Sequence, residues 1–110
     1  MTKFTESSDK KFAKDIIAGA PNQEKAWLNF DHEVGGVESK IPRKYKELIS
    51  LGAALTTQCP YCLEKHTKLA KENGATEEEI AETIMITATL RSGAAMGYGL
   101  LVMKLFKDEE

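Results

Sequence analysis

The stretch "KYKELISLGAALTTQCPYCLEKHTKLAKENGATEEEIAETI", residues 44–84, contains both cysteines and one of the two histidines of this 110-residue chain. Leu48, Leu51 and Leu55 recur at i, i+3 and i+7, which predicts a helix that starts around Ile41-Pro42 and runs towards Gln58. The stretch therefore indicates helical structure leading directly into the cysteines.

Three further signals place the next helices. Pro60 suits the first turn of a helix, where its missing N–H costs nothing, so a fourth helix starts near Cys59 or Pro60. Gly74 ends that helix after about Asn73. "TEEE" at 76–79 is typical of a capping box that opens a fifth helix.

The remaining chain also indicates helices. Segment 6–18 has apolar residues at helical spacing, and a second helix begins with Pro21 and carries the apolar face of Trp27, Leu28 and Phe30. "VGGVESKIP" at 34–42 is a connector, and Ser92-Gly93 predicts a break before a sixth helix at about 93–106. We expect an all-α, single-domain bundle of about six helices over residues 1–110.

Composition narrows the class of protein. The chain is 42% hydrophobic and 29% charged, with a formal net charge of −2, so we expect no nucleic-acid partner. No apolar run reaches the roughly 20 residues of a membrane span. The start "MTKFTESSDKK" has no apolar signal core, so we expect a cytoplasmic protein. Two cysteines in a reducing compartment are not typical of a stabilising disulfide.

The last two predicted helices are apolar around most of their circumference, as "IAETIMITATL" and "AAMGYGLLVMKLF" show. A surface helix of a small domain should have one apolar stripe, and a 110-residue monomer has too little protein to bury two such helices. We therefore expect a homo-oligomer with these helices in its interfaces. The alternative is a helix hairpin in the centre of the core.

The cysteines and His66 form the candidate site. On one helix, Cys59, Cys62 and His66 share a face, because they are spaced by three and then four residues. An imidazole one turn from a thiol is a standard way to generate a thiolate near neutral pH. The helix N-terminus adds a second stabilising field at Cys59.

Other readings of the cysteines stay open. Zinc normally takes four ligands, or three plus water, and this cluster supplies three at most, with His32 on a separate predicted helix. A thioredoxin-like site requires a strand before the C-x-x-C, whereas this chain looks all-α. Two buried cysteines and a satisfied core histidine are a third, purely structural interpretation.

Glu47 lies at the edge of the apolar stripe of the third helix. From the periodicity alone, the simpler interpretation is that Glu47 is a charge at the edge of the buried face. If the third and fourth helices pack antiparallel, however, Glu47 faces the cysteine–histidine stripe and can orient His66 or accept a proton from it.

Glu47, the pair in "CPYC" at 59–62 and His66 together have the spacing of the alkylhydroperoxidase D-like proteins of the carboxymuconolactone decarboxylase superfamily, and "GATEEEIAE" follows as in that family. The chain resembles them over roughly residues 20–106. It departs at Tyr61, where the larger members have a histidine. The decarboxylase branch usually lacks the C-x-x-C, so the resemblance disfavours decarboxylation.

The resemblance implies an all-α trimer, or a hexamer built from trimers, that needs no metal or prosthetic group. It implies a thiol-dependent peroxidase or disulfide reductase acting on a hydroperoxide or another small molecule, with a dithiol-reducing protein as partner. Glu47 would serve the proton relay, His66 would be the base, Cys62 the peroxidatic cysteine and Cys59 the resolving one. The alternatives are a non-catalytic redox sensor and a carboxymuconolactone decarboxylase-type lyase.

Two further residues invite a functional reading. His32 can belong to a neighbouring subunit's site, although a surface histidine near a helix end is the commoner case. Arg91 can bind an anion or a reducing partner, or form a salt bridge in an interface.

Overall fold

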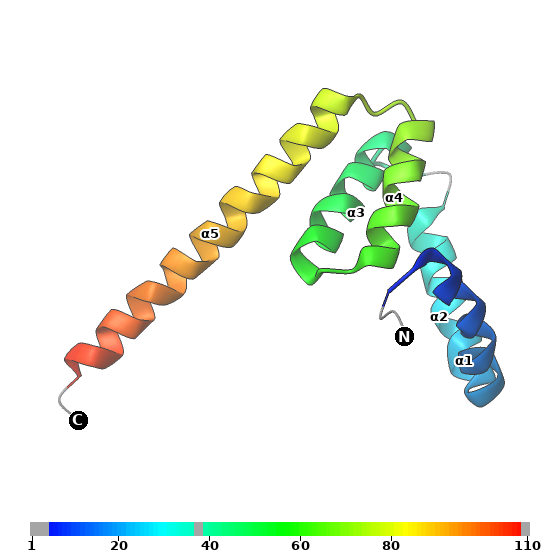
Figure 1. The fold of residues 1–110 in the computed structure, drawn as a ribbon, viewed down its shortest axis with the longest axis horizontal. Coiled ribbons are helices and arrows are strands. Elements are labelled where there is room, and N and C mark those ends of the chain that lie inside the picture. Colours follow the sequence, from blue (N-terminus) through cyan, green and yellow to red (C-terminus); the bar gives the residue numbers. More distant parts are fainter. Residues whose placement is uncertain (1–4, 37–38, 109–110) are drawn as a thin grey trace.

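The computed structural model describes residues 5–36 and 39–108 as a series of helices (Figure 1). A short 3₁₀-helix is followed by five α-helices: η1 (Ser7–Phe12), α1 (Ala13–Gly19), α2 (Pro21–Gly35), α3 (Arg43–Thr57), α4 (Pro60–Glu72) and α5 (Glu77–Lys107). Within the described ranges there is no strand, so the all-α prediction is confirmed. The predicted connector includes residues 37 and 38, which lie outside those ranges, as do both ends of the predicted domain.

Helices α3 and α4 form a tight hairpin at the centre of the molecule. Gln58 ends α3 in the left-handed conformation (φ 57°), and the Cys59 N–H donates to the carbonyl of Ala54 over 3.1 Å. Leu51 and Ala54 of α3 and Ala70 of α4 are buried in this hairpin. The helix boundaries predicted around Pro60 and Asn73 are confirmed to within two residues.

The connection from α4 to α5 follows the predicted signals. Gly74 adopts φ 91°, a conformation that favours glycine, just after α4 ends. The Glu79 N–H donates to the Thr76 hydroxyl over 3.1 Å, and the Thr76 N–H donates to the Glu79 carboxylate over 2.8 Å. The capping box is confirmed, and it directs α5 back across α3.

The predicted break at Ser92-Gly93 is wrong, because α5 is a single helix of 31 residues. The Ser92 hydroxyl donates to the carbonyl of Thr89 over 2.9 Å, which satisfies it inside the helix. One glycine in a helix interior costs only about 1 kcal/mol relative to alanine, too little to interrupt so long a helix. Because α5 is one continuous helix, the alternative of a helix hairpin in the centre of the core is also wrong.

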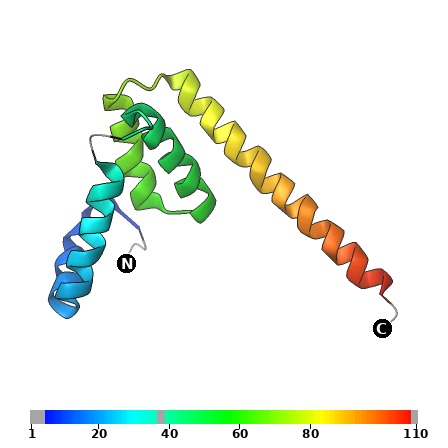
Figure 2. The same cartoon turned by 180° about the vertical axis from the view of Figure 1, so that it is seen from behind.

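The single chain is extended, as two views of the ribbon show (Figures 1 and 2). Its radius of gyration is 18.6 Å, whereas a compact domain of this length should have about 13 Å. The α1–α2 arm projects on one side of the hairpin and α5 on the other. Trp27, Leu28 and Phe30, predicted to be buried, are exposed in the single chain.

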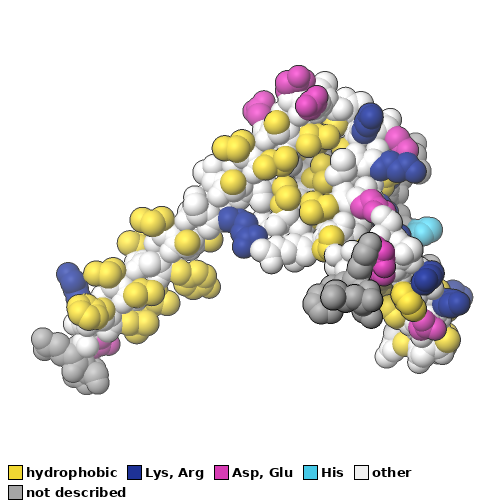
Figure 3. All heavy atoms as spheres, viewed as in Figure 1, with side chains coloured by type: hydrophobic (Ala, Val, Ile, Leu, Met, Phe, Trp, Pro, Cys, Tyr) yellow, Lys and Arg dark blue, Asp and Glu magenta, His cyan; other side chains and the backbone are white. Residues whose placement is uncertain are grey.

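Residues 93–106 of α5, which we call its free half, project beyond the hairpin (Figure 1). Apolar side chains cover this part of the helix (Figure 3). Met96, Tyr98 and Leu100 are each 74% exposed, and Phe106 is 82% exposed. Among the described helices, none is both long enough and apolar enough to cross a membrane.

Candidate functional site

Both cysteines lie at the N-terminus of α4. Cys59 is the N-cap, in extended conformation, and its sulfur accepts the Cys62 N–H over 3.3 Å. The two cysteines form a disulfide with their Cα atoms 5.3 Å apart, a separation that such a bond accommodates without backbone movement. The N-terminus of α4 therefore holds two half-buried cysteines whose sulfurs are directly linked.

Glu47 is buried, contrary to the simpler interpretation of a rim charge. It is 3% exposed, and its Oε2 lies 2.7 Å from His66 Nδ1. The hairpin produces this contact, because α3 carries Glu47 on the face that packs against α4. The predicted juxtaposition of Glu47 with the cysteine–histidine face is present, and His66 is half-buried beside it.

The geometry limits how the imidazole can act. A carboxylate accepts hydrogen bonds, so with Glu47 ionised the proton of a neutral His66 sits on Nδ1 and Nε2 is left with a lone pair. Cys62 is one helical turn before His66 on the same face of α4. The arrangement can therefore serve proton transfer to and from a thiol.

Sequence reasoning missed one residue of this cluster. Arg43 Nε lies 3.1 Å from Glu47 Oε1, so both carboxylate oxygens of Glu47 have a partner. The signal was available, since Arg43 precedes Glu47 by four residues and such pairs are neighbours on a helix.

Tyr61, which directly precedes Cys62, points to the N-terminal segment. Its hydroxyl donates to the Asp9 carboxylate over 2.7 Å, and Glu64, one turn later, accepts from Ser7 and pairs with Lys10 at 3.0 Å. The hydrogen bond from Tyr61 lowers the pKa of Asp9 and raises the pKa of Tyr61. The phenol thus ties η1 to the outer face of α4.

The two additional candidates lie apart from this cluster. His32 is exposed on α2, and no hydrogen bond links it to the cysteines or to Glu47. Arg91 on α5 donates to the carbonyl of Leu55 at 3.4 Å, near the end of α3. In the part of the chain that the structure describes, no three His, Cys, Asp or Glu side chains are grouped as metal ligands.

The sequence model of the carboxymuconolactone decarboxylase family matches residues 21–105, most of the chain. The chain belongs to this family. The match begins with α2 and ends near the C-terminus of α5, so it includes all four residues of the candidate site. The family contains enzymes of both the alkylhydroperoxidase-like and the decarboxylase-like branches.

Two relatives extend this assignment. The chain is 41% identical over 61 residues to "Uncharacterized protein 4 in cox locus" from Paracoccus denitrificans, a match that covers 56% of this chain and 55% of the relative. It also resembles the crystal structure of a structural-genomics target from Methanobacterium thermoautotrophicum, with a TM-score of 0.72 and 30% identity. That match covers 79% of this chain and 97% of the other, and so supports the same fold.

Proposed function

We propose that the protein is a thiol-dependent peroxidase or disulfide reductase that uses Cys59 and Cys62 as its redox pair. One observation carries the proposal: the buried carboxylate of Glu47 contacts His66, which lies one helical turn after Cys62 on α4. A carboxylate–imidazole pair next to a thiol is a way to activate a nucleophile. A purely structural disulfide has no need of a buried proton relay.

The proposed cycle begins with the reduced pair. His66, oriented by Glu47, takes the proton of the Cys62 thiol, and the thiolate attacks the O–O bond of a hydroperoxide ROOH. Cys62 becomes a sulfenic acid and the leaving alkoxide is protonated to ROH. The Cys59 thiol then displaces water from the sulfenic acid and forms the disulfide. An external dithiol reduces it by exchange and is itself oxidised.

The assignment of the attacking sulfur rests on the position of His66, one turn after Cys62. The N-cap position favours negative charge on Cys59 instead, since its sulfur accepts a backbone N–H. We assign Cys62 as the nucleophile and Cys59 as the resolving cysteine. Fast oxidation of Cys59 by peroxide in Cys62→Ser, together with slow oxidation of Cys62 in Cys59→Ser, would reverse this assignment.

The deciding experiment is steady-state consumption of cumene hydroperoxide by reduced, metal-free protein supplied with dithiothreitol. We expect sustained turnover that is lost in Cys62→Ser and falls about 100-fold or more in His66→Ala, as for a positioned general base. Lys68→Ala, an exposed position on the same helix, is the matched control. A single oxidation without turnover would favour a redox sensor, and activity that survives removal of both cysteines would favour a lyase.

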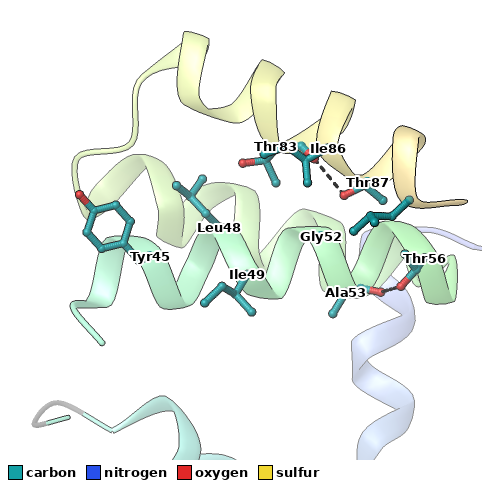
Figure 4. A pocket seen from close by; sticks show the side chains of 10 residues that line it. Tyr45, Leu48, Ile49, Gly52, Ala53, Thr56, Thr83, Ile86 and Thr87 are labelled. Carbon is teal, nitrogen blue, oxygen red and sulfur yellow. Dashed lines mark hydrogen bonds between the residues drawn. The ribbon is translucent and has the colours of Figure 1, made fainter. Parts of the chain in front are cut away.

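We further propose that the protein acts as a homo-oligomer, a trimer or a hexamer, in a reducing, cytoplasmic compartment with a dithiol-reducing protein as partner. An apolar groove of about 690 Å³ runs between α3 and α5 (Figure 4). Ten residues line it: Tyr45, Leu48, Ile49, Gly52, Ala53, Thr56, Thr83, Ile86, Thr87 and Leu90.

A second copy of the chain is the occupant that we propose for this groove. The segment 92–103 of α5 has no charged residue, and its large apolar side chains are exposed in the single chain. The groove-lining part of α3 is about 17 Å long and the free part of α5, residues 93–106, is about 20 Å long. Light scattering after size exclusion should give three or six times the monomer mass. A measured mass equal to that of the monomer would contradict the proposed oligomer.

A further inference from the structure

Glu47 poses an electrostatic problem, because it is 3% exposed and can remain ionised only with charged or hydrogen-bonding partners. Its two partners differ in kind. His66 carries a positive charge only when doubly protonated, and in that state it cannot accept a proton. Arg43 carries its charge at every working pH. When the imidazole is neutral, it can still donate a hydrogen bond to the carboxylate, but the compensating positive charge comes from the guanidinium.

The protonation of Glu47 decides whether Nε2 of His66 is a free base or carries the imidazole proton. An ionised Glu47 accepts the Nδ1–H and leaves Nε2 as a base. A protonated Glu47 donates its O–H to Nδ1 instead, so the imidazole proton moves to Nε2. That tautomer presents an N–H to the thiol and cannot take its proton.

Several other charged side chains around the hairpin have partners other than Glu47. On α3, Lys44 pairs with Glu79 of α5 at 3.0 Å and Lys46 donates to the carbonyl of Val34 at 2.7 Å. On the outer face of α4, the ion pairs join Lys10 to Glu64 and Lys65 to Asp31. Arg91 of α5 donates to a carbonyl near the end of α3. Of the polar contacts recorded across the described ranges, those of Glu47 are to Arg43 and His66.

We propose that Arg43 is a positioning residue of this relay: by binding the second oxygen of Glu47, it keeps the carboxylate ionised and His66 in the tautomer whose Nε2 is free. The inference rests on the proposed function for its purpose, but its structural content concerns only Arg43, Glu47 and His66. The side chain of Arg43 is about one-third exposed, so we expect its substitution to leave the core of the hairpin intact.

The test reads the tautomer directly. ¹⁵N NMR of the reduced full-length protein at neutral pH distinguishes Nδ1–H, Nε2–H and doubly protonated imidazole, and the exposed His32 is an internal reference. We expect the Nδ1–H tautomer for His66 in the wild type and in Arg43→Lys. Arg43→Gln should shift His66 to the Nε2–H or doubly protonated form. Arg43→Met, which retains the alkyl stem, takes the place of Arg43→Gln if that variant does not fold.

The matched control is Lys44→Gln, which removes the same charge from the same helix but breaks the pair with Glu79. It should leave the His66 spectrum unchanged. A wild-type spectrum in Arg43→Gln would overturn the inference. So would an equal change in Arg43→Lys or Lys44→Gln, because packing or overall charge would then be the cause.

A second readout connects the tautomer to the thiol. In a Cys59→Ser background, the rate at which iodoacetamide alkylates Cys62 is followed from pH 5 to 9. Arg43→Gln should lower the rate at neutral pH by about tenfold, part of the roughly 100- to 10,000-fold that a positioned base contributes, and Lys44→Gln should not. An unchanged pH profile in Arg43→Gln would contradict the inference. Neither readout requires peroxide turnover, so a failure of the proposed peroxidase activity would be recognised separately.

Discussion

The α3–α4 hairpin buries a charged side chain, whereas the free half of α5 exposes apolar ones. The hairpin encloses a charged residue, Glu47, and supplies partners for both of its oxygens. The free half of α5 leaves apolar side chains such as Leu100 and Phe106 exposed. Burying a charge and exposing a large apolar surface both cost free energy. The first cost is offset inside the chain, whereas the second would be offset by the oligomer that we propose.

The largest expected effect is on the free half of α5. Leu100→Asp would place an unpaired charge in the proposed interface, so we expect the oligomer to dissociate and the apparent stability to fall with it. Sedimentation velocity should show the monomer. Lys104→Asp, a charge change one turn further along the same helix, is the control. An unaltered mass for Leu100→Asp would mean that α5 has no apolar contact there, and the contrast between the two regions would disappear.

A cavity in the hairpin should lower the stability of the fold without dissociating the oligomer. Leu51 is 4% exposed, and Leu51→Ala should lower the free energy of unfolding by about 2–5 kcal/mol. Denaturant unfolding measures the loss, and light scattering on the folded variant should give the wild-type mass. Dissociation of a still-folded Leu51→Ala protein would show that the hairpin core and the interface are one cooperative unit.

A smaller effect is expected at the start of α5. Thr76→Ala removes the side-chain oxygen that accepts the Glu79 N–H, at a cost of about 0.5–2 kcal/mol in unfolding free energy. Thr89→Ala, in the middle of the same helix, deletes a hydroxyl bonded only to the preceding turn and is the control. Thermal unfolding of both variants makes the comparison, and equal losses would argue against a specific capping effect.

The smallest effect concerns the contact between η1 and α4. The pKa of Asp9 is lowered by the hydrogen bond from Tyr61, and the pKa of Glu64 by Ser7 and then Lys10. The stability contributed by carboxyls with lowered pKa values is present at neutral pH and is lost as pH falls below about 4. The NMR resonances of the Tyr61 ring should shift in that range towards those of an unbonded phenol. If they do not move, the contact is absent in solution.

Much of the fold was predictable because its signals are local. The proline at the start of α4, the glycine after it and the Thr76–Glu79 box depend only on backbone geometry within a few residues. The break at Ser92-Gly93 was predicted wrongly from an equally local signal. Glycine weakens a helix but does not end one whose other residues favour it.

In the candidate site, too, the local features were predictable from the sequence and the contact between helices was not. The amino-acid sequence by itself determined that Cys59, Cys62 and His66 share one helix face, because a helix repeats every 3.6 residues. The spacing of Arg43 and Glu47 on α3 also made their pairing predictable, because residues four apart are neighbours on a helix. Only the tertiary structure decided that Glu47 is buried and lies against His66. The physical reason is that this burial and this contact arise from the approach of two helices, and no pattern within a single helix specifies how they approach.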